Sequence, residues 1–259
     1  MPATWTDAYL RRLGYGGART PSREVLRELH ELHLLRVPFE NLDIHWQRPI
    51  VVDEMRFIRK IVEGRRGGFC YELNGAFGTL LRELGFEVAH LSARVPKSQG
   101  EGLGPPFDHM ALLVTPGDGS RWLADVGFGD SFFSPLTLDN TEAQRDRNGI
   151  YRIERDGDDW RYLSKRGEAW ALEYLFSLEP HALDEFAPMC DFQQSSPDSA
   201  FTKKRICSLA TENGRVSLTD SKLIITHGEV KEEIPVPAAE WARVLEETFG
   251  IEPPLSSGA

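Results

Sequence analysis

Apolar residues in the first part of the chain recur at spacings of three and four, which is the period of an α-helix. The segment 5–15 is amphipathic. Thr20-Pro21-Ser22 is a typical helix start ahead of the periodic run 23–37, which Pro38 ends. A further helix is expected from Cys70, because the apolar residues after it keep this spacing: Leu73, Phe77, Leu80, Leu81 and Leu84. The pattern therefore predicts a helical domain over residues 1–85.

The pattern changes to short β-rich segments between Phe86 and about Leu178. Turn residues at 117–119 and at 156–159 each separate two such segments, which suggests two antiparallel hairpins. After Pro180 we expect a loop-rich stretch over residues 191–205. It leads into strands near 206–211, 214–220 and 221–227 and a final helix at 238–250.

The order of these elements predicts an α+β fold in three parts. An N-terminal helical bundle (1–85) is followed by a central antiparallel β-barrel-like domain (86–190) and a C-terminal α/β lid (191–259).

Composition narrows the classes of function. The chain has 259 residues and a formal net charge of -10, which argues against a partner such as nucleic acid that requires a basic surface. No stretch approaches eighteen apolar residues and the N-terminus has no apolar signal-peptide core, so we expect no membrane partner and a cytoplasmic location. The cysteines, Cys70, Cys190 and Cys207, are odd in number and widely spaced, which argues against a disulfide framework or a zinc ribbon.

Cys70 is the first candidate for chemistry. It follows Gly67, Gly68 and an aromatic residue, and glycine pairs suit a tight turn where the backbone approaches another segment closely. We expect the thiol to lie in the first turn of the helix, where the helix dipole favours the reactive thiolate. The alternative is a small buried hydrophobic residue, as many lone cysteines are.

A cysteine nucleophile needs a base and a group that orients the base. His109 begins an apolar segment and Asp125 ends the next one, so an antiparallel pairing about the turn at 117–119 would place the two side by side. An imidazolium beside Cys70 would favour its thiolate. Taken separately, His109 could be an ordinary hydrogen-bonded residue and Asp125 a turn former.

Other motifs are weaker. His30 and His33 are three residues apart, but no cysteine or carboxylate pattern completes a metal site, so no metal is predicted. The glycines of 127–129 match only the start of a dinucleotide-binding fingerprint; they could admit a cofactor closely or simply end a strand. The basic run 203–205 is either solvated or close to a phosphate-bearing cofactor.

Five segments together resemble the arylamine N-acetyltransferases, and the resemblance covers almost the whole chain. They are YLRRLGY (9–15), VPFENL (37–42), RGGFCYELN (66–74), DHM (108–110) and DVGFG (125–129). The resemblance implies that Cys70 is acetylated and that His109 and Asp125 complete a papain-like Cys-His-Asp triad.

The resemblance also implies roles for residues around this triad. Arg12, Glu40 and Arg66 are expected to form a buried ion-pair network that supports the active-site loop. Gly127, Phe128 and Gly129 are expected to contact coenzyme A, and Phe128 also to line the acceptor pocket.

The activity implied is a two-step transfer. Acetyl-CoA, as co-substrate, acetylates Cys70, and the acetyl group then passes to the nitrogen of an arylamine or arylhydrazine. Four aromatic residues are candidates for stacking on this acceptor, although each could instead belong to the core: Phe39, Phe69, Phe128 and Phe201. The sequence leaves the physiological acceptor, the range of acyl chains and the oligomeric state open.

Two other classes of function remain. The same order of Cys, His and Asp occurs in transglutaminases and, with Asn in third place, in papain-like proteases, where the acyl donor is an amide. A non-catalytic binding protein with this fold is the second alternative, and an unreactive Cys70 would support it.

Overall fold

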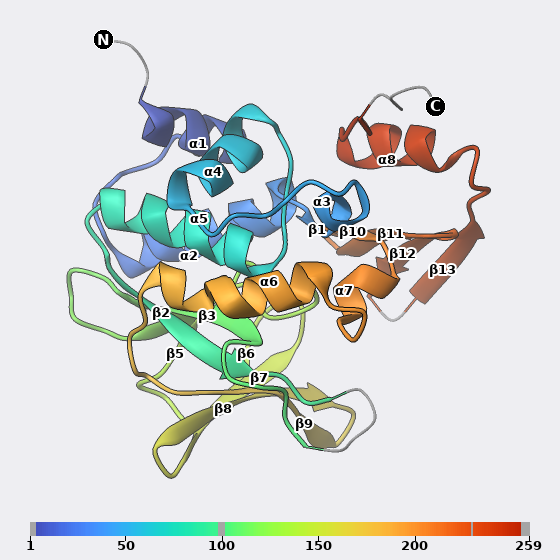
Figure 1. Cartoon of the computed structure of the whole chain (residues 1–259). Coiled ribbons are helices and arrows are strands. Elements are labelled where there is room, and N and C mark those ends of the chain that lie inside the picture. The colour runs from blue at the N-terminus through green and yellow to red at the C-terminus, as the bar shows by residue number, and fades with distance from the viewer. Residues whose placement is uncertain (1–3, 98–101, 229, 255–259) are drawn as a thin grey trace.

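The computed structural model describes residues 4–97, 102–228 and 230–254. Its N-terminal part is helical, with α5 surrounded by the other helices (Figure 1). The elements are α1 (Trp5–Leu13), α2 (Arg23–Arg36), α3 (Leu42–His45), α4 (Glu54–Ile58), the π-helical turn η1 (Arg59–Glu63) and α5 (Cys70–Glu83). The three helices predicted from periodicity up to residue 85 are therefore confirmed as α1, α2 and α5.

Side-chain caps explain where these helices begin. The hydroxyl of Thr4 accepts the N–H of Asp7 at the start of α1, and Ser22 caps α2 through the N–H of Val25. Asp53 caps α4 in the same way, through the N–H of Arg56. Each cap satisfies a backbone donor that the first helical turn leaves free.

The central part is an eight-stranded antiparallel sheet that curls into a nearly closed barrel, in the order β5-β4-β3-β2-β9-β8-β7-β6. Its strands are β2 (Glu87–Arg94), β3 (His109–Thr115), β4 (Trp122–Ala124), β5 (Leu136–Thr137), β6 (Gln144–Arg145), β7 (Ile150–Asp156), β8 (Asp159–Arg166) and β9 (Ala169–Phe176). Both predicted hairpins are confirmed, as β3–β4 and β7–β8.

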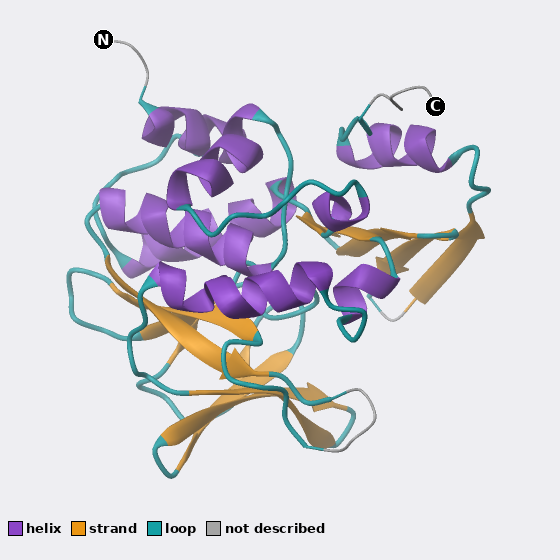
Figure 2. Ribbon diagram, in the orientation of Figure 1, coloured by secondary structure: helices purple, strands orange, loops and turns teal. Residues whose placement is uncertain are grey.

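The C-terminal part combines helices with a second sheet, which lies apart from the barrel in Figure 2. The sheet is five-stranded, in the order β1-β10-β11-β12-β13, and β1 comes from the N-terminal part. The elements are the 3₁₀ turn η2 (Leu183–Phe186), α6 (Ala187–Ser195), α7 (Ala200–Lys203), β1 (Phe39–Glu40), β10 (Ile206–Thr211), β11 (Gly214–Thr219), β12 (Lys222–His227), β13 (Val230–Pro235) and α8 (Trp241–Phe249).

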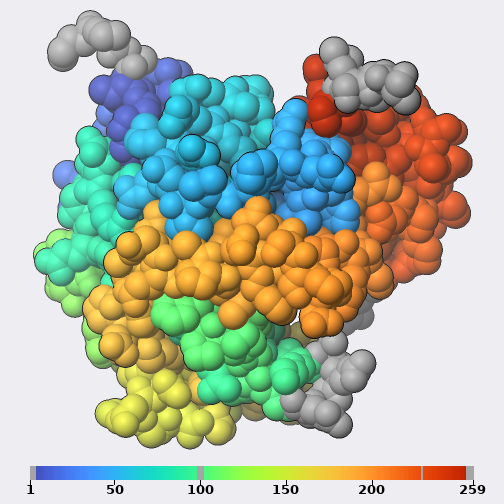
Figure 3. Space-filling view, in the orientation of Figure 1, coloured from blue at the N-terminus to red at the C-terminus, as the bar shows by residue number. Residues whose placement is uncertain are grey.

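The loop predicted over residues 191–205 is wrong where α6 continues to Ser195 and where α7 forms, and most of the segment 183–203 is helical. The segment lacks a regular apolar stripe, and only Cys190 and Gln193 of α6 are buried. Its stability comes from packing, because Phe186 and Cys190 join the same core as α5. In the space-filling view this segment (orange) crosses the boundary between the N-terminal helices (blue and cyan) and the β2–β3 region (green) (Figure 3).

The predicted α+β fold class is confirmed, with its helical bundle, barrel-like sheet and α/β end. The division into domains at 1–85, 86–190 and 191–259 stays a prediction; its second boundary falls inside α6. The use of the C-terminal part as a lid also stays a prediction.

Candidate active site

Cys70 is the first residue of α5, in the first helical turn as predicted. The turn before it packs tightly: a Cβ on Gly67 would lie 1.8 Å from the carbonyl oxygen of Pro38, so only glycine fits. At the helix start, the N–H of Phe69 donates to Glu72 Oε2 at 3.2 Å. Cys70 is 4% exposed, and it lines a cavity of about 630 Å³.

The β3–β4 hairpin brings His109 and Asp125 together. Leu112 pairs with Ala124 in the ladder, and His109 Nε2 donates to Asp125 Oδ2 at 2.7 Å. The thiol of Cys70 lies near enough to the ring to contribute to the raised pKa of His109. The predicted juxtaposition of His109 and Asp125 is thus confirmed, and Cys70 lies beside the same ring.

The electrostatics of this cluster favour a charged imidazole. Burial by itself lowers the pKa of His109, but the charge and hydrogen bond of Asp125, together with Cys70, raise it to about 10. Burial likewise would raise the pKa of Asp125, but His109 and other donors hold it below its ordinary value. The buried His109–Asp125 pair is therefore an imidazolium and a carboxylate near neutral pH.

Sequence reasoning missed three residues that hold Asp125. Asn74 Nδ2 donates to Asp125 Oδ1 at 2.8 Å, and Tyr174 Oη donates to Oδ2 at 3.1 Å. His30 Nε2 accepts the backbone N–H of Asp125 at 3.1 Å, so His30 is a buried structural residue of this site. Asn74 could have been found, because it lies four residues after Cys70 and hence on the same helix face. Tyr174 and His30 carry no such local signal.

Gly127 allows the loop after β4 to cross the start of α5. Its N–H donates to Asp125 Oδ1 at 2.9 Å. A Cβ at this position would lie 2.8 Å from both Cys70 Cα and Asn74 Nδ2. The absence of a side chain therefore lets the segment that carries Asp125 approach the helix that carries Cys70.

The cavity beside Cys70 contains most of the predicted ligand contacts. Phe39, Phe128 and Phe201 line it, and so does Gly127. Phe69 does not: it is fully buried behind the cavity wall, with its ring edge-on to Phe201 at 5.7 Å, which corrects its prediction as a stacking residue. Gly129, which was predicted to contact coenzyme A, is not among the described residues that line this cavity.

The cavity wall also includes polar residues that the sequence did not indicate. Asp108, Gln193 and Ser199 line it, and Phe192 of α6 lies at its mouth, 40% exposed. Gln193, Ser199 and Phe192 belong to the segment expected to be a loop, so their convergence on Cys70 follows from packing between distant parts of the chain.

A buried ion-pair network lies behind the turn before Cys70. Arg66 Nη2 contacts Glu40 Oε1 at 2.7 Å and Asp43 Oδ1 at 3.1 Å, and Lys60 Nζ contacts Asp43 Oδ2 and Glu72 Oε1, both at 2.7 Å. Burial raises the pKa of Glu72 to about 7, against the lowering effect of Lys60. Because Glu72 also accepts a backbone N–H at the start of α5, the network connects directly to the helix that carries Cys70.

Arg12, which was predicted to belong to this network, does not join it. Within the described residues it forms no ion pair, and its Nε is buried without a hydrogen-bond partner. Burial and, after it, the like charge of Arg65 lower the pKa of Arg12. The predicted trio is therefore corrected to Glu40 and Arg66 with Lys60 and Asp43.

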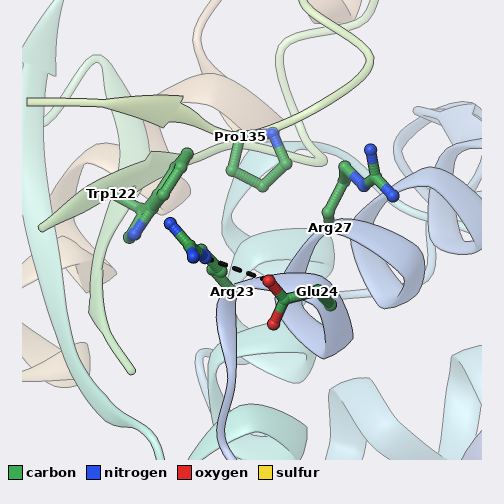
Figure 4. Close-up of a pocket in the computed structure, with 5 residues that line it drawn as sticks. All are labelled: Arg23, Glu24, Arg27, Trp122 and Pro135. Atoms are coloured by element: carbon green, nitrogen blue, oxygen red, sulfur yellow. Dashed lines mark hydrogen bonds and ion pairs between the residues drawn. The ribbon is translucent and has the colours of Figure 1, made fainter. Parts of the chain in front are cut away.

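A second hollow lies between α2 and the strands β4 and β5 (Figure 4). It has a volume of about 260 Å³ and is lined by Arg23, Glu24, Arg27, Trp122 and Pro135. Arg23 pairs with Glu24 across its edge, and both side chains are largely exposed. It contains none of the candidate catalytic residues.

The part of the chain that the structure describes contains no group of three or more His, Cys, Asp or Glu side chains placed to hold a metal ion. In the same ranges, no helix has both the length and the apolar character needed to cross a bilayer.

Comparison with known proteins assigns the family. A model of an N-acetyltransferase family matches residues 22–255. The chain is 35% identical to the arylamine N-acetyltransferase / N-hydroxyarylamine O-acetyltransferase of Salmonella typhimurium, over 96% of this chain and 89% of that protein.

Solved structures support the same family assignment. An arylamine N-acetyltransferase structure from Salmonella typhimurium superposes with a TM-score of 0.90 at 33% identity, covering 99% of this chain and 95% of that one. The Mycobacterium marinum enzyme in complex with CoA superposes with a TM-score of 0.87 at 30% identity, covering 94% and 92%. The chain therefore belongs to the arylamine N-acetyltransferase family.

Proposed function

We propose that this protein transfers an acetyl group from acetyl-CoA to the nitrogen of an arylamine or arylhydrazine through an acetyl-Cys70 intermediate. The observation that carries the proposal is the arrangement of His109, which lies between the carboxylate of Asp125 and the thiol of Cys70 at the wall of a cavity. Membership of the family supports the same reaction.

In the first half-reaction, Cys70 acts as nucleophile. His109 as an imidazolium stabilises the thiolate, which attacks the thioester carbonyl of acetyl-CoA. Backbone N–H groups at the start of α5, among them that of Cys70, would stabilise the negative charge on the carbonyl oxygen. The C–S bond to coenzyme A then breaks, and His109 donates its proton to the departing coenzyme thiolate, which leaves the imidazole neutral in the acetyl-enzyme.

In the second half-reaction, the neutral aromatic amine attacks the acetyl group on Cys70. His109 accepts the proton that the nitrogen loses, and Asp125 stabilises the resulting charge and fixes the ring. The C–S bond to Cys70 breaks and the thiolate is restored. Both half-reactions therefore use the same three side chains, so that no further catalytic group is required.

Other residues are assigned supporting roles in this proposal. Phe39, Phe128 and Phe201 offer aromatic surfaces to the acceptor. Gly127 and Phe128 line the cavity together with Cys70, and we assign them contacts with coenzyme A. Glu40 and Arg66 hold the turn before the nucleophile.

The partners proposed are the small acceptor and coenzyme A. Neither nucleic acid nor a membrane is among them, in keeping with the net charge of -10. We place the reaction in the cytoplasm, where the three cysteines, all free, would stay reduced.

Transfer to oxygen is a second candidate activity. The relative from Salmonella typhimurium is named for N-hydroxyarylamine O-acetylation as well as for N-acetylation. An N-hydroxyarylamine would present its hydroxyl oxygen to the acetyl-enzyme, and His109 would accept the O–H proton in place of an N–H proton.

The test is the intact mass of the protein after brief exposure to acetyl-CoA. We expect a gain of one acetyl group, about 42 Da, that disappears when an arylamine is added. Cys70→Ala should abolish the gain, whereas Cys207→Ala, which removes a buried thiol of the C-terminal core, should keep it. An enzyme that ignores acetyl-CoA but is acylated by an amide donor would contradict the proposal, and so would a Cys70 that remains unmodified by both.

A further inference from the structure

Asp108 is a carboxylate in the wall of the cavity that the proposed reaction does not use. It immediately precedes His109, and both residues line the cavity together with Cys70. Its Oδ1 accepts Gln193 Nε2 at 2.8 Å, and its Oδ2 occupies space that Gly104 leaves, because a Cβ there would lie 2.4 Å away. Since Gln193 and Gly104 also line the cavity, the carboxyl group itself lies in the cavity wall.

The backbone before Asp108 is held in an unusual conformation. Phe107 has a φ of 66°, which is uncommon for a residue with a side chain. Its N–H donates to Ser92 Oγ at 2.8 Å, and its carbonyl oxygen accepts Tyr71 Oη at 2.7 Å. Strained backbone that several contacts hold in place is typical of functional sites, and here it fixes where Asp108 lies.

The partner of Asp108 on α6 is fixed as well. Gln193 is 7% exposed, and its Oε1 accepts Ser199 Oγ at 2.7 Å, so its amide NH₂ must point toward Asp108. This assigns one donor to the carboxylate, and the nearby backbone of Val95 acts to lower the pKa of Asp108. A carboxylate accepts about four hydrogen bonds, so Asp108 keeps capacity for a ligand.

Asp108 has no cationic partner of its own. Among the described residues, no lysine or arginine lies within ion-pair distance of it. The nearest charged group is His109, which is already paired with Asp125. Two further charged residues line the cavity, Lys97 and Asp198, and their charges are opposite in sign. Burial raises the pKa of Asp108, since the carboxylate is partly withdrawn from water. A positive or hydrogen-bond-donating group that lies next to Asp108 would therefore be stabilised, and a negative group at that position repelled.

We propose that Asp108 selects the acceptor: aromatic amines that carry a second, cationic hydrogen-bond-donating substituent are preferred, and those with an anionic substituent are disfavoured. The inference rests on the proposed function and names the class of acceptor that this site takes. Asp108 acts here through substrate binding, so its effect falls on the acceptor step and not on acetylation of Cys70.

The experiment compares three anilines whose substituent is separated from the ring by a methylene group, so that the reacting amine keeps a similar nucleophilicity. They are 4-(aminomethyl)aniline, which is cationic at neutral pH, 4-ethylaniline, which is neutral, and 4-aminophenylacetate, which is anionic. We expect kcat/KM for the cationic acceptor to exceed that for the anionic one by at least about tenfold, mainly through KM.

Asp108→Asn keeps the shape and removes the charge. It should bring the ratio of kcat/KM for the cationic acceptor to kcat/KM for the anionic acceptor close to one. The kcat/KM for the neutral acceptor should change less than about threefold. Asp191→Asn removes an exposed carboxylate of α6 outside the cavity and should keep the wild-type ratio. A ratio that Asp108→Asn leaves at the wild-type value overturns the inference.

The failure of this inference can be told apart from failure of the proposed function. The intact mass of each variant after exposure to acetyl-CoA alone reports the first half-reaction. If wild-type protein forms no acetyl-enzyme, the proposed function fails and this inference fails with it. If it forms acetyl-enzyme but uses the anionic aniline as well as the cationic one, only the role of Asp108 is refuted, even where Asp108→Asn does not fold.

Discussion

Gly127→Ala tests whether close approach of the loop after β4 to α5 sets the geometry of the site. The new Cβ would lie 2.8 Å from Cys70 Cα, whereas 3.4 Å is the lower end of ordinary contact, so one segment must move by about 0.6 Å. The start of α5 is fixed, because Phe69 and the rest of its first turn are buried. We therefore expect the loop that carries Asp125 to move, and His109 with it.

The expected magnitude has two parts. Overpacking of this kind costs about 1–3 kcal/mol of the free energy of unfolding. A displacement of about 1 Å in catalytic geometry can reduce a rate by roughly 100-fold, so a shift of about 0.6 Å should reduce kcat/KM by roughly 10- to 100-fold, or ~1.4–2.7 kcal/mol in activation free energy. Gly16→Ala is the control, because a Cβ at Gly16 has no atom within 4 Å, and it should change stability by less than about 0.5 kcal/mol.

The assay must separate positioning from coenzyme binding, since Gly127 lines the cavity. Urea denaturation reports stability, and kcat/KM for acetyl-CoA reports the reaction. The rate at which iodoacetamide alkylates Cys70, followed by intact mass, reports the cysteine and its histidine without any coenzyme. If Cys70 of the Gly127→Ala variant is alkylated at the wild-type rate, the loop has not moved the histidine, and the argument from close approach is refuted.

Three further predictions concern the buried charges. The pKa of His109 is raised by Asp125 from about 6.5 to about 10. The stability that this raised pKa contributes is therefore complete below pH 6.5 and is lost as the pH rises toward 10. In urea titrations, the difference in unfolding free energy between wild type and His109→Asn should shrink over that range. Tyr174→Phe removes a buried hydrogen bond to a charged group and should cost about 1.5–3 kcal/mol, with a smaller loss counting against a charged Asp125. Glu40→Gln leaves buried cations without a full partner and should cost about 3–5 kcal/mol by the same measurement, whereas Glu247→Gln, in an exposed pair, should cost less than about 0.5 kcal/mol.

Local signals explain why part of the fold could be predicted from the sequence. The start of α5 follows from two glycines before a periodic run, and the β3–β4 hairpin follows from its turn at 117–119. Cys70 and His109 begin such elements and Asp125 directly follows one, so locating the ends also located these residues.

Elements that depend on distant partners could not be predicted in this way. α6 has only two buried residues and is stabilised by packing against the N-terminal core, so its own sequence resembles a loop. The two-residue strand β1 exists because Phe39 and Glu40 pair with β10, more than 160 residues later. The ion-pair network likewise joins side chains from separate segments, which is why Lys60 and Asp43 were missed and Arg12 was wrongly included.

Asp125 and Asp108 are held by different elements of the fold. Asn74 lies one helical turn after Cys70 and donates to Asp125, so the same face of α5 carries the nucleophile and an anchor for the group that orients His109. The relative positions of these groups are therefore set by one helix and one hairpin. Asp108, by contrast, is held from α6 through Gln193. Substitutions of Gln193 should thus alter which acceptor is used while leaving acetylation of Cys70 intact, so acceptor choice can diverge without loss of the first half-reaction.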